Sequence, residues 1–496
     1  MSARSNGFRA TALALACFAA FPVAHAAHVD PRLAASADAD ALIIFAPADR
    51  TLSPLATDAN YKVRRAALVD ALRAHADATQ HDVRAWLDAN GIAYRSYWIA
   101  NVIEARLPAS ALSALGARSD VLRIESNVRI PLELPPQTMP ASPAAPDAVS
   151  WGVTKIEAPA VWAAGFNGQG VVIAGEDTGY QWDHPALQPQ YRGWDGAAAE
   201  HDYNWHDSIH DSSGNPCGND SPEPCDDVGH GTHTAGTFAG DDGATHQTGV
   251  APGAKWIGCR NMDAGAGTPA RYIECMQWML APTDLADANP NPELAPDIVS
   301  NSWGCPASEG CTVGDEIEQA VENVVAGGIF FVASAANDGP ACETIGTPPA
   351  IYDASFVVGA TDSNDRIAGY SSRGPVVAST LIRPDLAAPG SSVLSSLPPN
   401  TYGTLSGTSM AAPHVSGTAA LLMSVDPSLK GHPDRVAAIL RASTVTDGIT
   451  DPSNSGCGGL TMSDWPNYQA GFGRLDALAA VILADTIFAD GFESSP

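Results

Sequence analysis

Three short segments of the sequence carry residue types that together can catalyse acyl transfer. Asp177 follows the apolar run VVIAG and precedes Thr-Gly, a turn signal. His230 lies between glycines in GHGTHTAG, and Ser409 precedes the apolar stretch of GTSMAAPHVSG. An imidazole titrates near neutral pH, a carboxylate can orient it, and a serine hydroxyl becomes a nucleophile when an adjacent base takes its proton. The three residues together therefore predict a catalytic triad.

Each segment also has a purely structural interpretation. Aspartate is common in turns, and Ser409 can cap the helix that follows it, which contributes about 1 kcal/mol. A zinc site at His230 and His233 is disfavoured, because the Gly-Thr between them lacks the glutamate of His-Glu-x-x-His. We interpret His233 as a structural residue. The helix after Ser409 is apolar on all sides and should be buried, while the amides and dipole at its start favour a developing oxyanion.

The elements around these segments predict an α/β domain from about Val149 onward. Short β-rich runs bounded by Gly, Asp or Pro alternate with helical stretches, which is typical of a parallel sheet covered by helices. In such sheets, functional residues gather at the carboxyl ends of the strands. The expected strands are residues 171–175, 297–303, 328–335 and 355–360, and the expected helices are residues 271–281 and 316–326.

A separate module without cysteine precedes this domain. Its apolar patterns predict the order β-α-β-β-α-β, which is that of the split βαβ unit. The expected elements are a strand at 41–46, a helix at 61–90, strands at 92–99 and 102–108, a helix at 109–117 and a strand at 121–130. Residues 131–148 are rich in proline, which has no amide donor, so they predict an extended and accessible linker.

The segments around Asp177, His230 and Ser409 resemble the three signature blocks of the subtilisin-like serine proteases, over roughly residues 150–482. The segments CRNMD, SNSWG and SSRGP resemble the secreted bacterial branch of this family that includes bacillopeptidase F. The resemblance implies a three-layer α/β fold with a mostly parallel central sheet. It also implies hydrolysis of peptide bonds in proteins through an acyl-enzyme, with protein or peptide substrates and no cofactor required for the chemistry.

The N-terminal module is similar to the family's inhibitory propeptide. The resemblance implies a small α+β, ferredoxin-like module that assists folding, blocks the cleft and is removed by autoprocessing. The expected organisation is a signal peptide (1–26), an inhibitory propeptide (38–131), a linker with the maturation site (132–148), a catalytic domain (149–483) and a short acidic tail after the last helix (484–496).

The resemblance implies further site residues around the triad. Asn337, in FVASAANDG, takes the place of the asparagine whose side-chain amide donates to the oxyanion. Two positions depart from the family pattern: Ala336 replaces a usual glycine, and Glu176 replaces a usual apolar residue. We expect Glu176 to stay outside the triad, because adjacent strand residues point to opposite faces. The residues implied in substrate binding are an exposed strand, Ser302, Trp303 and Gly304, and a pocket, Ser334, Ala335, Ala336 and Gly346.

The first residues have the pattern of a secretory signal. Arg4 and Arg9 precede an apolar run that ends near Val23, and Ala24-His25-Ala26 follows as a small-x-small cleavage site. The run is too short to span a bilayer comfortably. We therefore expect a secreted protein that has no membrane attachment once the signal is removed.

The composition is strongly acidic. The chain has 55 Asp and Glu against 26 Lys and Arg, a formal net charge of -29. A charge of this sign repels nucleic acid, so we expect no nucleic-acid partner. The excess acid either keeps the protein soluble, which we favour, or binds a hard cation such as calcium. The acidic insert at 202–227 either shapes specificity or holds structural calcium, and the metal ligands are left unassigned.

The cysteines predict disulfides. Eight cysteines remain once Cys17 is lost with the signal, and an even number in an exported chain favours pairing. Sequence alone does not fix the connectivity. Proximity favours Cys217–Cys225 and Cys305–Cys311, which leaves Cys259–Cys275 and Cys342–Cys457.

Three other functions are weighed against a general endopeptidase. A binding protein with an inactive protease fold is disfavoured by the complete set of Asp177, His230, Ser409 and Asn337. A secreted esterase would use the same serine, and the ratio of ester to peptide turnover distinguishes it. A processing protease of narrow specificity is an alternative within the same chemistry.

Overall fold

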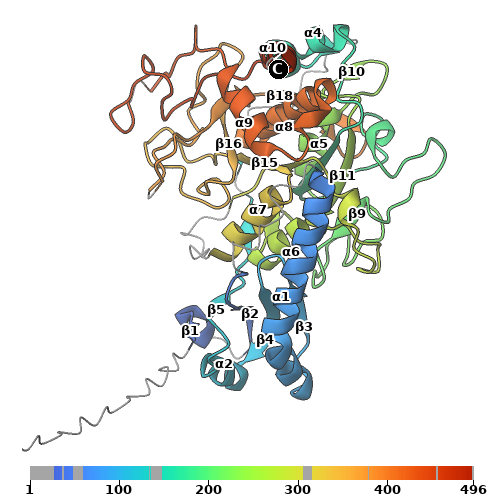
Figure 1. Ribbon diagram of the computed structural model, residues 1–496, viewed down its shortest axis with the longest axis vertical. Helices are drawn as coiled ribbons and strands as arrows, with labels where there is room; N and C mark the ends of the chain where they lie inside the picture. The colour runs from blue at the N-terminus through green and yellow to red at the C-terminus, as the bar shows by residue number, and fades with distance from the viewer. Residues whose placement is uncertain are drawn as a thin grey trace, which may run out of the picture.

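The computed structural model comprises a small N-terminal module below a larger α/β domain (Figure 1). The expected signal peptide, most of the linker, and the pair Cys305–Cys311 lie outside the described part of the chain. The structure describes residues 27–35, 38–48, 60–132, 134–135, 148–304, 315–377, 379–453 and 456–493.

The larger domain is built on a seven-stranded sheet in which every neighbouring pair is parallel. Both faces of the sheet are covered, so its strands are almost entirely buried. In spatial order the strands are β17 (Leu386–Pro389), β16 (Phe356–Thr361), β15 (Phe330–Ser334), β14 (Ile298–Asn301), β8 (Val172–Asp177), β11 (Lys255–Arg260) and β9 (Trp205–Asp207).

Helices on both faces of the sheet complete three layers (Figure 1). Helices α5 (His230–Ala239) and α8 (Thr408–Val425) share one apolar cluster with Ile173 of β8. Helices α6 (Pro269–Leu280) and α7 (Asp315–Ala326) share another with the next residue, Ala174. Because successive strand residues point to opposite faces, β8 contributes to both clusters. The predicted three-layer α/β fold is confirmed.

The remaining elements are short or peripheral. They are the helices α3 (Trp151–Lys155), α4 (Ala158–Ala163), α9 (Pro433–Ala442) and α10 (Ala477–Glu493), the 3₁₀ turns at Gln188–Gln190, Pro292–Leu294 and Pro427–Leu429, and the strands β7 (Ala148–Val149), β10 (His246–Gln247), β12 (Met262–Asp263), β13 (Ala266–Gly267), β18 (Val393–Leu397) and β19 (Thr401–Leu405).

The N-terminal module has the expected order β-α-β-β-α-β. Its strands form a sheet in the order β1-β5-β2-β4-β3, and a short β1 adds to the expected set. The elements are β1 (His28–Val29), a 3₁₀ turn (Pro31–Ala35), β2 (Asp38–Ile44), α1 (Tyr61–Ala89), β3 (Tyr94–Tyr97), β4 (Val102–Pro108), α2 (Ala109–Gly116) and β5 (Arg123–Ser126).

The last strand expected in this module is divided in two. Strand β5 ends at Ser126, and β6 (Ile130–Pro131) joins a different sheet, with β13 of the larger domain. Asn127 lies at the division: its side chain accepts from the Ala270 amide, 3.1 Å away, and donates to Glu104 at 2.8 Å. These bonds turn the chain out of the module's sheet.

Two other expectations are settled by the described residues. The expected tail is partly helical, because α10 continues to Glu493 without a proline to end it. The expected bridges Cys217–Cys225, Cys259–Cys275 and Cys342–Cys457 are present. Within the described ranges, no helix is long and apolar enough to cross a membrane.

The close packing of α5 against α8 depends on Gly417. A Cβ at this position would lie 2.5 Å from the Val250 Cβ and 3.0 Å from the Phe238 carbonyl oxygen. We therefore expect Gly417→Ala to lower the free energy of unfolding by about 1–3 kcal/mol through overpacking. Gly369→Ala is the control, since no atom lies within 4 Å of its Cβ position. Equal thermal unfolding midpoints for the two variants would contradict this packing.

Candidate active site

The side chains of Asp177 and His230 are in direct contact. Oδ1 of Asp177 lies 2.6 Å from Nδ1 of His230, and the two side chains are 2% and 1% exposed. Asp177 ends β8, and His230 is the first residue of α5. The carboxylate also accepts from the Thr178 amide at 2.7 Å and from the Thr234 hydroxyl at 3.2 Å. It is therefore held by several donors and oriented toward the imidazole.

Gly231 makes this contact possible. A Cβ there would lie 2.1 Å from the Gly179 carbonyl oxygen and 3.0 Å from the Asp177 Cβ. The start of α5 therefore approaches the end of β8 more closely than any larger residue would allow. Close packing against β8 therefore explains why Gly231, the second glycine of GHGTH, has no side chain.

The other ring nitrogen of His230 is available for chemistry. Among the described residues, its Nε2 has no hydrogen-bond partner, although it is buried. A buried, unpaired polar atom is unfavourable in a folded protein and often marks a functional site. The arrangement leaves one ring nitrogen fixed by a carboxylate and the other free to take a proton.

Ser409 is the second residue of α8, and Gly407 is the residue at the N-cap. The alternative interpretation of Ser409 as the helix cap is therefore wrong. Its Oγ donates to the Ser302 carbonyl oxygen at 3.1 Å, and the Ser302 hydroxyl donates to the Ser409 carbonyl oxygen at 3.0 Å. These reciprocal bonds fix the start of α8 against the end of β14.

Asn337 lies beside Ser409, and its orientation is set by Thr408. The Asn337 Oδ1 accepts from the Thr408 amide at 2.9 Å and from the Thr408 hydroxyl at 3.1 Å. With Oδ1 engaged there, the donor end of the side chain is its Nδ2. Sequence reasoning missed Thr408, although its place directly before Ser409 was a signal. The neighbouring Ala336 has φ 72°, a left-handed conformation in which glycine is the easier residue.

Ser409 and Asn337 line one small cavity of about 40 Å³. Five of the seven residues expected to bind substrate line this cavity, namely Ser302, Trp303, Gly304, Ser334 and Ala336. The other two, Ala335 and Gly346, do not line this cavity. Ala335 packs into an apolar cluster with Ile345 instead, and Gly346 is exposed while its neighbour Thr347 lines the wall.

Trp303 forms one wall of the cavity and is also part of the core. It is 2% exposed, and its ring stacks on Tyr272 with the centroids 3.8 Å apart and the planes 2° from parallel. Trp303 is therefore both a wall of the cavity and a residue of the core. Such a rigid aromatic pair gives the cavity a fixed shape.

A chain segment already lies in this cleft. Strand β6 pairs antiparallel with β13, with Ile130 opposite Gly267 and Pro131 opposite Ala266. The Leu132 amide then donates to the Gly265 carbonyl oxygen at 2.7 Å. Pro131 and Leu132 also line the cavity beside Ser409. Sequence reasoning placed the substrate-pairing strand at residues 302–304 and missed the hairpin of β12 and β13 on the opposite side.

Two other buried ionisable residues lie near the pair but do not join it. His233 donates to the carbonyl oxygen of Val393 at 3.0 Å or of Gly403 at 3.2 Å, and burial lowers its pKa to about 3. It is a structural residue, as expected. Burial raises the pKa of Glu176, whose Oε2 accepts from Asn261 at 3.4 Å on the opposite side of β8 from Asp177.

Asp207 connects the acidic insert at 202–227 to the central sheet. Its carboxylate forms a buried ion pair with Arg260 of β11, with contacts of 2.8 Å from each of two guanidinium nitrogens. In the part of the chain that the structure covers, no group of three or more His, Cys, Asp or Glu residues is arranged to hold a metal ion. Calcium binding by this insert stays a prediction.

Comparison with known proteins places the chain in a family. A model of the subtilase family matches residues 168–459. Bacillopeptidase F of Bacillus subtilis (strain 168) is 36% identical over 436 residues, covering 84% of this chain and 28% of that protein. Subtilisin DY of Bacillus licheniformis is 36% identical over 284 residues, covering 57% of this chain and 86% of that protein. The chain therefore belongs to the subtilase family of serine endopeptidases.

Proposed function

We propose that this protein hydrolyses peptide bonds in proteins and is made as a secreted, autoprocessed zymogen. One observation carries the proposal: residues 130–132 run as an added strand into the cavity lined by Ser409 and Asn337. An extended peptide paired by its backbone to an edge strand is how such clefts bind polypeptides. The chain covers less than a third of bacillopeptidase F, so neither that protein's activity nor its secretion transfers directly.

The geometry supports a defined role for each residue. Ser409 gives up its bond to the Ser302 carbonyl, turns toward Nε2 of His230 and attacks the peptide carbonyl as that nitrogen takes its proton. His230 then delivers the proton to the leaving amine. Asp177, 2.6 Å from Nδ1, fixes the tautomer and stabilises the imidazolium. Asn337 Nδ2 and the Ser409 amide stabilise the oxyanion, and water resolves the acyl-enzyme.

The N-terminal module fits the role of an inhibitor because it binds the first turns of two helices of the larger domain. Asn127 accepts from the Ala270 amide in the first turn of α6 at 3.1 Å. Arg123 pairs with Glu316 in the first turn of α7 at 2.8 Å. The segment that follows Asn127 then enters the cleft and occupies the place of a substrate. Docking and blocking therefore use one continuous stretch of chain.

Replacing the nucleophile tests the proposed chemistry. We expect Ser409→Ala to reduce casein hydrolysis by about 10⁶-fold in kcat, a magnitude known from the corresponding change in subtilisin, a relative. The variant should keep the wild-type thermal unfolding profile, because the Ser409 hydroxyl contributes one hydrogen bond. Casein hydrolysis retained by a folded Ser409→Ala preparation would remove Ser409 from the mechanism.

The oxyanion role of Asn337 has a distinct kinetic signature. We expect Asn337→Ala to lower kcat by about 100- to 1,000-fold, the range known for this donor in subtilisin, with little change in KM. Thr408→Val removes the hydroxyl that bonds Oδ1 of Asn337 while keeping the Thr408 amide bond, so it should lower kcat by a smaller factor. A rise in KM without loss of kcat in Asn337→Ala would indicate ground-state binding instead.

The contact between the two parts includes a tyrosine hydroxyl that lies between two carboxyl groups. The Tyr97 hydroxyl lies 2.8 Å from both Glu104 and Glu274, yet it has one proton to donate. Burial raises the pKa of Glu104 above its usual 4.5. Burial also opposes ionisation of Glu274, but hydrogen bonds from His206 and His210 outweigh it and lower the Glu274 pKa. Of the two carboxyl groups, Glu104 is therefore the one that takes up a proton more readily, and a protonated Glu104 could donate to Tyr97 while Tyr97 donates to Glu274.

This arrangement predicts that the module docks more firmly in acid. Burial raises the Glu104 pKa, and the nearby Glu274 of the larger domain adds to the rise in the docked state. The part of the docking free energy that comes from this contact is therefore full below pH 4.5 and is lost as pH rises through the raised pKa, by up to about 1.4 kcal/mol per pH unit. Hydrogen bonds to Glu274 hold the His210 pKa near 9 despite burial, so His210 stays protonated between pH 5 and about 8.

The measurement is hydrogen exchange of the backbone amides of the N-terminal module, in the full chain carrying Ser409→Ala. The exchange rates are measured from pH 5 to 8 and corrected for the intrinsic pH dependence of amide exchange. Glu104→Gln mimics the protonated carboxyl, because it can donate to Tyr97 and still accept from Asn127. We expect the wild-type contact to loosen as pH rises and the Glu104→Gln contact to stay firm. The same pH dependence in both would show that another group binds the proton.

A further inference from the structure

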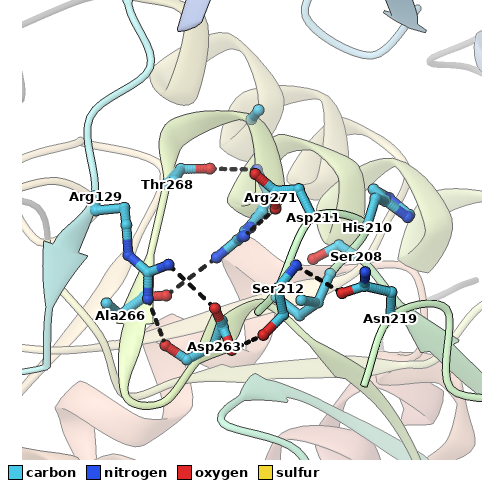
Figure 2. A network of polar contacts seen from close by, with 12 residues as sticks. Arg129, Ser208, His210, Asp211, Ser212, Asn219, Asp263, Ala266, Thr268 and Arg271 are labelled. Carbon is cyan, nitrogen blue, oxygen red and sulfur yellow. Dashed lines mark hydrogen bonds and ion pairs between the residues drawn. The ribbon is translucent and has the colours of Figure 1, made fainter. Parts of the chain in front are cut away.

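The cleft has a site for a positively charged side chain, and Arg129 occupies it in this structure (Figure 2). Arg129 directly precedes Ile130, the residue paired with Gly267 in the cleft. Its Nη1 lies 3.1 Å from Oδ2 of Asp263, and its Nη2 lies 2.9 Å from the Asp263 carbonyl oxygen. A guanidinium fork on two acceptors of one residue is a directed contact.

The Asp263 carboxylate is set in place by the protein around it. Its side chain is 5% exposed, and its other oxygen, Oδ1, accepts from Ser212 at 2.7 Å and from Asn215 at 2.6 Å. Although burial opposes ionisation, the hydrogen bonds from Ser212, Asn215 and Arg129 together lower the pKa of Asp263. Ser212 and Asn215 belong to the acidic insert, so this carboxylate stays oriented whether or not Arg129 is bound.

The backbone next to Asp263 is held as well. Asp227 accepts from the Ala264 amide at 2.7 Å, which supports the turn between β12 and β13. Asp227 also accepts from Asn215, the residue that donates to the Asp263 carboxylate. The nearby cation Arg271 is engaged elsewhere, 2.6 Å from Asp211 and 3.3 Å from the Ala266 carbonyl oxygen (Figure 2). The Asp263 site thus presents a fixed anion to the cleft.

We propose that Asp263 selects substrates by charge at one position. The substrate residue that binds in the place of Arg129 is preferably arginine or lysine, and it lies three residues before the one that binds in the place of Leu132. The proposal rests on the proposed function, because it treats residues 129–132 as a guide to how a substrate lies. Arg129 is 55% exposed, so the preference should be modest and sensitive to salt. The insert at 202–227 acts in this selection through Ser212 and Asn215, which hold the carboxylate.

The first experiment uses peptides with the sequence of residues 128–135, Val-Arg-Ile-Pro-Leu-Glu-Leu-Pro, and variants with Lys, Ala or Glu in place of the arginine. Each peptide competes with casein for protein purified after expression of the full chain. We expect the Arg and Lys peptides to inhibit about two- to fivefold more tightly than the Ala peptide, and the Glu peptide less tightly than the Ala peptide. In 0.5 M NaCl the differences should shrink.

The matched variant is Asp263→Asn, which keeps the shape of the side chain and removes its charge. The ratio of the Arg to the Ala inhibition constant is compared within each protein, so a general loss of activity cancels. We expect the ratio to approach one in Asp263→Asn. Equal constants for the Arg and Ala peptides in wild type, or an unchanged ratio in the variant, would overturn the proposal. If the variant does not fold, the charge series and salt dependence in wild type decide.

A second experiment does not depend on catalysis. In the full chain carrying Ser409→Ala, we measure amide exchange of Leu132, which donates to Gly265 in the cleft. Arg129→Ala and Asp263→Asn should each speed this exchange, and the double variant should add little. If the protein does not hydrolyse casein, the proposed function is wrong. The comparison of the two single variants with the double variant still tests whether Arg129 and Asp263 hold each other in the cleft. Unchanged exchange in Arg129→Ala, or fully additive effects, would refute the Asp263 site.

Discussion

Helices α5 and α8 pack directly against each other, and this contact decides where His230 and Ser409 lie. Each residue is in the first turn of its helix, so any displacement of one helix moves a reacting group. The contact is close because Gly417 leaves no side chain between α8 and the chain around Val250. The parallel sheet then places Asp177, at the carboxyl end of β8, against the start of α5. The rest of the proposed chemistry depends on this fixed arrangement.

In the proposed function, the pairing of an extended peptide with an edge strand links inhibition to specificity. Residues 130–132 pair with β13 through backbone hydrogen bonds that any polypeptide could make. Selectivity must therefore come from side chains beside that backbone, and the Arg129–Asp263 pair is one such contact. On this account, the segment that blocks the cleft also shows how a substrate would lie in it. On the same account, the acidic insert contributes to substrate binding through Ser212 and Asn215, which donate to Asp263.

Sequence could predict those features that depend on residue type and on local pattern. The alternation of apolar strands and helices was enough for the α/β fold, and Asp177, His230 and Ser409 were chosen for their chemistry. Strands β9, β11 and β17 were not expected: β9 has three residues, β11 has a short apolar run interrupted by Gly258, and β17 ends in Pro389. Such short strands are recognisable through their neighbours in the sheet and not through their own sequence.

Other features depend on contacts between distant residues, which no local pattern contains. The pairing of β6 with β13 joins segments more than 130 residues apart, and the role of Thr408 follows from its bonds to Asn337. Ala335 was assigned to the pocket through the family resemblance, but it packs against the apolar cluster that contains Ile345. Thus the residue types of the site were predictable, and their orientations were not.

The central claim is that Ser409 is a nucleophile activated by His230. The most direct measurement is reaction of the purified protein with a fluorophosphonate probe, followed by mass spectrometric mapping of the modified residue. The account predicts a single adduct on Ser409 in the wild-type protein, and a large loss of labelling rate in His230→Ala. An adduct on another residue, or labelling of Ser409 at an unchanged rate in His230→Ala, would contradict it.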